Sequence, residues 1–201
     1  DVDILLGTQM VAKGLNFPGV NLVGIILADS SLHLPDFRSY EKTFSLITQV
    51  AGRAGRYHSD GKVIIQTLNP KHHIMQQAAK LDIEGFYTRE LQSRKDLSFP
   101  PFKRILRILV RGRDNSRVWN LAEQLSSRVS AELSVMEGLD LEILGPSESP
   151  ISMLNHNYRV HMLLLSSRIA VLQKLLPEII AGIQQPPSSY IELDVDPQSL
   201  L

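Results

Sequence analysis

The sequence predicts an α/β protein in two parts, a parallel sheet with helices over residues 1–100 and an α+β domain over residues 101–201. Short apolar runs bounded by turn residues in the first part are typical of strands buried in a parallel sheet. The second part follows the order β-α-β-β-α-β, which is typical of ferredoxin-like domains. Between them, Phe-Pro-Pro-Phe at 99–102 forms a stiff joint, because each proline fixes its own φ and disfavours helix in the residue before it.

In the first part, apolar runs predict strands at 4–6 and 22–27, each buried on both faces. Apolar residues spaced three and four apart predict a helix over 39–54. The Asp60-Gly61 turn precedes a third strand over 62–67. Residues 70–96 predict two helices, the first opening at Asn69-Pro70 and the second at Asp82.

In the second part, alternating apolar and polar residues predict a strand over 104–112, and helical periodicity follows over 115–136. Two further strands are expected at 141–146 and 158–166, then a helix over 168–183 and a last strand over 190–195. Trp119 is expected in the core, on the buried side of its helix.

Composition limits the function classes. Lys plus Arg and Asp plus Glu number 21 each, so contact with nucleic acid has to come from a local basic patch. The absence of cysteine excludes disulfides and thiolate zinc sites within this chain. No apolar run approaches the roughly 20 residues of a membrane span, which predicts a cytoplasmic protein. The chain opens at Asp1, without Met and directly in a strand-like run, so we expect a segment of a longer protein.

The stretch TQVAGRAGR at 48–56 places Arg53 and Arg56 three residues apart at a helix end, so they point from roughly the same face. Two guanidinium groups there can grip one multivalent anion through paired, charge-assisted hydrogen bonds. The alternative is a surface helix end whose arginines complement the helix dipole. The loop GTQMVAKGLNFP at 7–18 is rich in small and phosphate-binding groups, as expected of a loop that contacts phosphates. The alternative is an ordinary connection between a strand and a helix.

Arginines gather on the strand over 104–112. Alternation puts Arg107 and Arg111 on one face and Arg104 on the other, and Arg159 and His161 lie on a second strand. This face is either a track for a DNA backbone or a solvated basic surface. Asp194 and Asp196 also alternate onto one face, but no third ligand is nearby, so we interpret them as structural.

These motifs carry a resemblance to a known family. GTQMVAKGLNFPGVNLV resembles motif V of the superfamily 2 DNA helicases, and QVAGRAGR resembles motif VI, with its pattern Q-x-x-G-R-x-x-R. The stretches FPPF, ILGPSESPISMLNHNYRVHMLLL and LDVDP resemble the C-terminal part of the replication-restart helicases. The resemblance covers nearly all 201 residues and implies that the first part is the C-terminal portion of RecA-like helicase lobe 2.

The resemblance also implies roles for single residues. Arg53 and Arg56 match the motif VI arginines that reach the ATP γ-phosphate, with Arg56 as the arginine finger and Gln49 as the polar residue that opens the motif. The motif V positions fall into a pair that couples nucleotide to DNA, Gly14 and Asn16, and a set that touches DNA phosphates, Thr8, Gln9 and Lys13. Many relatives have Asp where Asn16 stands, and the amide keeps the hydrogen bonding without the charge.

For the whole protein, the resemblance implies an ATP hydrolase that uses ATP and Mg²⁺, with a zinc-binding insertion upstream of this segment and no zinc within it. It implies forked and single-stranded DNA, single-stranded-DNA-binding protein and other primosome proteins as partners, in the cytoplasm and at the nucleoid. DNA contacts by Arg107 and Arg111 and a docking edge at Asp194 and Asp196 belong to the same expectation. This segment lacks the phosphate loop G-x-x-x-x-G-K-[ST], so we expect it to be inactive alone. The alternatives are a duplex DNA translocase and a non-catalytic interaction module.

Overall fold

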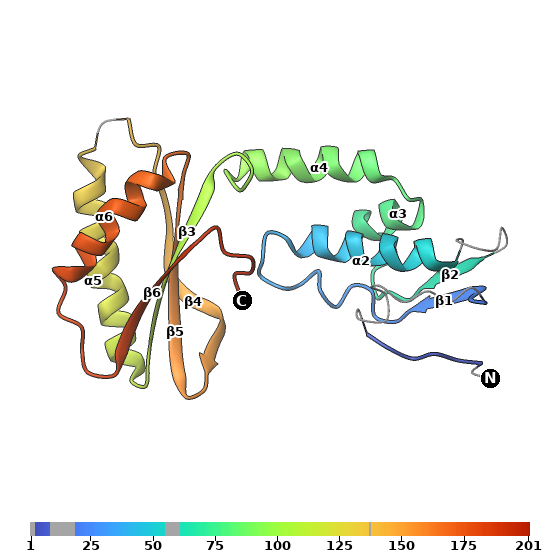
Figure 1. Ribbon diagram of the computed structural model, residues 1–201, viewed down its shortest axis with the longest axis horizontal. Helices are drawn as coiled ribbons and strands as arrows, with labels where there is room; N and C mark the ends of the chain where they lie inside the picture. The colour runs from blue at the N-terminus through green and yellow to red at the C-terminus, as the bar shows by residue number, and fades with distance from the viewer. Residues whose placement is uncertain (1–2, 9–18, 55–60, 137) are drawn as a thin grey trace. The chain divides into compact units, whose positions relative to one another are not determined.

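The computed structural model describes residues 3–8, 19–54, 61–136 and 138–201, and at residue 53 the backbone alone. The chain divides into two compact units, Asp1–Gln92 and Ser93–Leu201, named here the first and the second unit (Figure 1). The division falls inside helix α4, Ile83–Asp96. The domain boundary that the sequence suggests between residues 100 and 101 stays a prediction.

The first unit contains a parallel pair of strands, β1 (Leu22–Ile25) and β2 (Lys62–Ile65). Parallel neighbours need a crossover connection, and the helix α2 (Ser39–Ala54) lies within it. Helix α3 (His73–Ala79) and the start of α4 follow β2. The parallel sheet and the helix over 39–54 are both confirmed.

One face of each helix builds the core of this unit. Phe44 of α2 and Phe86 of α4 are almost fully buried, and their rings stack with centroids 4.0 Å apart and planes 3° from parallel. The other buried apolar residues of this core come from β1 and its following loop, α2 and α3: Ile25, Ala28, Leu32, Ile47, Ile74, Met75 and Ala78. Packing of α4 against α2 therefore includes an aromatic contact between residues far apart in the sequence.

Two expectations for these strands are wrong. Residues 4–6 form no strand, and the side chains of Ile4 and Leu6 are 86% and 84% exposed. The strand β1 is not buried on both faces, since Leu22 is 59% exposed, and Ile64 of β2 is likewise 60% exposed. The physical reason is the same in both cases. An apolar run becomes a buried strand only beside other strands and layers, and the described part of this sheet has two strands, with its core on one face.

Polar contacts tie the loops of the first unit together. The carboxylate of Asp29, after β1, accepts hydrogen bonds from the Thr67 hydroxyl at 2.9 Å and the Leu68 amide at 2.8 Å, both just after β2. Burial opposes ionisation of this group, but these hydrogen bonds outweigh it and hold the pKa of Asp29 below its usual value. Helix α3 begins at His73, later than expected, because His72 caps it by accepting from the Ile74 amide.

The second unit forms a four-stranded antiparallel sheet in the order β4-β5-β3-β6. Its elements are β3 (Arg104–Gly112), α5 (Asn115–Ser134), β4 (Glu142–Leu154), β5 (Asn157–Ser166), α6 (Ile169–Ala181) and β6 (Ser189–Val195). Both helices cover the same face of the sheet (Figure 1). This order and layering confirm the ferredoxin-like domain. No described helix is both long enough and apolar enough to cross a membrane.

Alternation along β3 and β5 sorts the side chains between the two faces of the sheet. Even-numbered residues of both strands, such as Ile108 and Met162, pack with α5 and α6 into one core. Trp119 packs against this core from α5, as expected. Odd-numbered residues therefore face away from the helices. We call this second surface the helix-free face, and it holds Arg107, Arg111, Arg159 and His161 on β3 and β5.

Strand β4 runs to Leu154, well past the expected end at residue 146. It contains Pro146 and Pro150, and its register against β5 shifts twice. In a sequence, prolines usually predict the end of a strand. Strand β4 continues past them because it is an edge strand, where a missing backbone N–H is tolerated. The hairpin closes through two residues with positive φ, Asn155 at 50° and His156 at 61°, as in the turns favoured for two-residue hairpins.

Candidate functional site

The first unit contains the residues that the helicase resemblance singles out. Gln49 and Arg53 lie in the second half of α2, and the side chain of Gln49 is exposed. Thr8 is exposed at the end of the segment 3–8. The remaining predicted residues of this unit lie outside the described residues: Gln9, Lys13, Gly14, Asn16 and Arg56. Their roles, and those of Gln49, Arg53 and Thr8, stay predictions.

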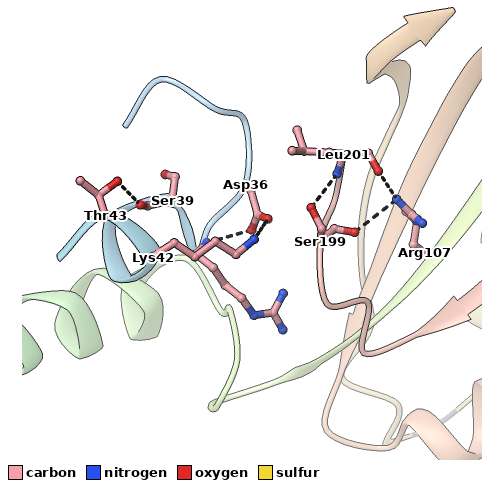
Figure 2. Close-up of polar contacts among 8 residues, drawn as sticks. Asp36, Ser39, Lys42, Thr43, Arg107, Ser199 and Leu201 are labelled. Atoms are coloured by element: carbon pink, nitrogen blue, oxygen red, sulfur yellow. Dashed lines mark hydrogen bonds and ion pairs between the residues drawn. The ribbon is translucent and has the colours of Figure 1, made fainter. Parts of the chain in front are cut away.

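The start of α2 is anchored by polar contacts. The buried carboxylate of Asp36 accepts from the Arg38 amide at 2.9 Å and from Lys42 Nζ at 2.8 Å (Figure 2). The backbone carbonyl of Asp36 accepts from the Ser39 amide. One turn later, the Thr43 hydroxyl donates to the Ser39 carbonyl at 2.8 Å. A negative group at a helix N-terminus also complements the helix dipole. The helix that bears Gln49 and Arg53 is therefore firmly held at its opposite end.

In the second unit, the arginines of β3 pair with acids of β6 and the residue after it. Nη2 of Arg107 lies 3.1 Å from a carboxylate oxygen of Asp194, and Nε of Arg111 contacts Glu192. At the sheet end, Nε of Arg104 lies 2.8 Å from Asp196. Asp194 and Asp196 thus have partners within their own domain. The basic face expected from β3 alone is largely neutralised by its neighbour.

Arg107 is also occupied by the last residues of the chain. Its Nη1 donates to the backbone oxygens of Ser199 at 3.4 Å and Leu201 at 3.5 Å (Figure 2). The side chain of Leu200 between them is buried. Arg107 is 12% exposed, against 35% for Arg111. The structure therefore gives Arg107 a role in fastening residues 199–201, and of the two predicted DNA-binding arginines, Arg111 is the more accessible.

Arg111 has an aromatic neighbour. Its guanidinium carbon lies 4.6 Å from the ring centroid of Tyr190, which stands directly opposite it on β6 and is half exposed. A cation over an aromatic face is attracted by the ring quadrupole. Reasoning from the sequence missed Tyr190. Alternation along β6 places Tyr190 on the same face as Glu192 and Asp194. The sequence could point to Tyr190 only if the pairing of β6 with β3 were already known.

On the other side of Arg111 lies Arg159 of β5, directly opposite it in the β3–β5 register. Arg159 is buried, and burial together with the positive charge of Arg107 lowers its pKa. His161, two residues along, has a lowered pKa because of burial and the charges of Arg107 and Arg159. Three cations and a histidine therefore share the helix-free face with Glu192 and Asp194.

Comparison with known families agrees with the division of the chain into two units. Residues 1–58 match the family described as helicase conserved C-terminal domain. Residues 95–198, more than half of the chain, match the family described as primosomal protein N C-terminal domain. The chain belongs to the primosomal protein N family. The superfamily 2 helicase resemblance and the assignment of the first unit to a RecA-like lobe are confirmed by the same two matches.

Relatives in this family match this chain over nearly its whole length. The replication restart protein PriA of Treponema pallidum is 41% identical over 200 residues, which cover 100% of this chain and 30% of that protein. The protein of the same name from Bacillus subtilis is 40% identical over 202 residues, covering 99% of this chain and 25% of the relative. That of Borreliella burgdorferi is 38% identical over 205 residues, covering 100% and 30%. The chain thus spans less than a third of the length of these primosomal protein N relatives.

Proposed function

We propose that the chain is the C-terminal segment of an ATP-dependent DNA helicase that binds and remodels stalled replication forks and starts primosome assembly. The observation that carries the proposal is the order of the two family matches, a helicase C-terminal domain at 1–58 followed by a primosomal protein N domain at 95–198. Relatives named replication restart protein match across both units. A duplex translocase would share the first match and has no need of the second.

In this proposal the first unit supplies half of an ATP site. Arg53 and Arg56 would contact the γ-phosphate from across a cleft that the other lobe completes, with Gln49 as the polar residue that opens the motif. Bound ATP with Mg²⁺ would supply the phosphoryl group, and its transfer to water would drive movement. Arginine suits the role because its planar fork stabilises charge spread over phosphate oxygens, and an arginine finger contributes about 10³- to 10⁵-fold in rate. Gly14 and Asn16 link the nucleotide to the DNA.

The DNA contacts are divided between the units. Thr8, Gln9 and Lys13 contact the phosphates of the tracked strand, and Arg111 adds a contact from the second unit. Support for Arg111 over Arg107 comes from its greater exposure and its freedom from residues 199–201. Single-stranded-DNA-binding protein and other primosome proteins are the proposed protein partners, and the zinc-binding insertion lies elsewhere in the whole protein.

The test uses the whole protein with Arg56→Ala and Arg56→Lys. Hydrolysis of ATP and strand separation should fall by about 10³-fold or more in the alanine variant, with binding to forked DNA nearly unchanged. Lysine keeps the charge without the planar fork, so it should rescue activity in part. Arg117→Ala, an exposed arginine on α5, is the matched control and should have no effect on either reading. Normal hydrolysis by Arg56→Ala would remove the arginine-finger role, and failure to displace strands by the unaltered protein would favour the translocase.

A further inference from the structure

We propose that the outer edge of β6 binds an extended, basic segment of a partner protein, which joins the four-stranded sheet as a further antiparallel strand. In the bound state, apolar side chains of the partner lie beside Leu193, and its lysine or arginine side chains lie beside Glu192 and Asp194. The inference rests on the proposed function only in that such a partner belongs to primosome assembly. It is carried by β6 and its neighbours in the second unit.

The backbone of β6 has one side free for pairing. Strand β6 ends the sheet, with β3 on one side and no described strand on the other. The Asp196 amide, just after the strand, donates to the Ile105 carbonyl at 2.8 Å. Hydrogen-bonded and non-hydrogen-bonded pairs alternate in an antiparallel ladder, so the even-numbered residues of β6 point their backbone groups toward β3. The backbone groups of Ile191, Leu193 and Val195 therefore point outward, and within the described part of the chain no residue is hydrogen-bonded to them.

The edge of β6 also lacks features that ordinarily prevent pairing. The strand has the sequence Ser-Tyr-Ile-Glu-Leu-Asp-Val, without the proline or lysine that native proteins place on exposed edges. Its register against β3 continues without a shift from Ser189 to Val195, so the outward groups lie in a regular row. Extended peptides add to sheets at edges of this kind, where backbone hydrogen bonds supply affinity and side chains supply specificity.

The side chains of β6 indicate what kind of strand fits. On the helical side, Leu193 is 39% exposed, between Ile191 and Val195, which pack against the core. On the helix-free face, the side chains of Glu192 and Asp194 are 47% and 45% exposed. Each of these carboxylates contacts an arginine of β3 through one oxygen, and an ionised carboxylate can accept further hydrogen bonds. A strand that alternates apolar and basic residues therefore matches both faces at once.

The same acids disfavour a second copy of this chain as the occupant. Two β6 strands that meet antiparallel about residue 192 place Glu192 opposite its own copy, and about residue 193 they place Glu192 opposite Asp194. Parallel strands in register align each acid with itself. Like charges at opposed positions destabilise a sheet, whereas opposite charges stabilise it. Charge complementarity thus selects a basic partner over a second copy or an acidic peptide.

A fluorescein-labelled heptapeptide of alternating valine and lysine serves as the probe, and anisotropy follows its binding to the 201-residue chain and to the whole protein. Both should bind it, and a heptapeptide of alternating valine and glutamate should bind about fivefold or more weakly. An antiparallel strand exchanges hydrogen bonds with Ile191, Leu193 and Val195 through the residues directly opposite them, which are the valines. N-methylation of the valines should therefore abolish binding, and N-methylation of the lysines should leave it nearly unchanged.

Variants of β6 test the same contacts from the other side. Leu193→Pro removes one outward N–H, which an edge strand tolerates, and should weaken binding by about twofold to tenfold relative to Leu193→Ala, which keeps it. Glu192→Gln should weaken binding of the lysine peptide by about 1.5-fold to fivefold and strengthen that of the glutamate peptide. Glu123→Gln, the same change at an exposed position of α5, is the matched control and should alter neither. The urea midpoint reported by Trp119, which packs on the core of this unit, checks that each variant is folded.

Hydrogen–deuterium exchange on the unaltered chain provides a measurement that needs no variant. The lysine peptide should slow exchange at the outward amides of Ile191, Leu193 and Val195. Binding without this protection would overturn the proposal, as would full binding of the valine-methylated peptide.

The alternative occupants give different results. Slow exchange at these amides in the whole protein without peptide would refute a partner protein, because another segment of that protein would already cover the edge. Protection of the 201-residue chain that rises with its own concentration would instead assign the edge to a second copy. Since the readouts are peptide binding and amide exchange, none of these outcomes depends on ATP hydrolysis or on Arg56.

Discussion

Truncation of Phe86 to alanine should strongly destabilise the first unit and leave the stability of the second one unchanged. Phe86 is 1% exposed and stacks on Phe44, so its loss leaves a cavity in a core of few residues. Phe→Ala changes in such positions destabilise by about 3–5 kcal/mol. Whole domains are stable by only about 5–15 kcal/mol, and the two strands that the structure describes in this unit have exposed apolar side chains. The expected loss is therefore a large part of the free energy of unfolding of the first unit.

Two probes separate the units in urea unfolding. The chain has one tryptophan, Trp119, which packs on the core of the second unit, so its fluorescence reports that unit, while circular dichroism reports the helices of both. With a slope of about 1–3 kcal/mol per molar urea, the first transition should move down by roughly 2 M in Phe86→Ala. The Trp119 transition should stay in place. Tyr87→Ala is the control, because that neighbouring aromatic side chain is 49% exposed and should change neither transition by much.

The reasoning is refuted if the Trp119 transition of Phe86→Ala moves down together with the dichroism signal. Joint movement would mean that the two units unfold as one cooperative body. The compact division within α4 would then have no energetic counterpart.

Two further predictions concern catalysis and pH. The isolated 201-residue chain should show no ATPase activity above background, with or without DNA, because its sequence holds no phosphate loop, and DNA-stimulated turnover by the pure chain would contradict the half-site proposal. Burial and the charges of Arg107 and Arg159 lower the pKa of His161 below 6.5, so the unfolded state takes up a proton first as pH falls through that value. The urea midpoint reported by Trp119 should therefore fall from neutral pH to about pH 5. His161→Gln should flatten this dependence, and an equally steep pH profile in the variant would exclude His161 as its source.

Elements with strong local periodicity could be predicted from the sequence. The helix α2 carries apolar residues at helical spacing, which identifies the element and its buried face. Strands β3 and β5 are recognisable by their runs of branched apolar residues, although neighbours such as Ile105 and Leu106 are both buried. Burial depends on neighbours that no local pattern contains. The apolar side chains of Ile4 and Leu6 are exposed because residues 4–6 join no described sheet.

The candidate site was predictable only in part, for the same reason. Alternation correctly placed Arg107 and Arg111 on one face of β3. The alternation gives no information about which strand lies beside these arginines. The acids of β6 that neutralise them lie more than 80 residues away in the sequence. The helix-free face depends on contacts of this long range, including the pairing that sets Tyr190 opposite Arg111.

The prolines of β4 have a consequence for how molecules of this protein meet each other. An exposed edge strand offers free N–H and C=O groups, which invite pairing with the edge of another sheet and lead to aggregation. On β4, Pro146 and Pro150 have no N–H to donate, and the two register shifts bend the edge out of line. A second copy cannot extend the sheet along this strand without leaving hydrogen bonds unmade. The same interruptions that hid the length of β4 in the sequence keep its outer edge from acting as a template for polymerisation.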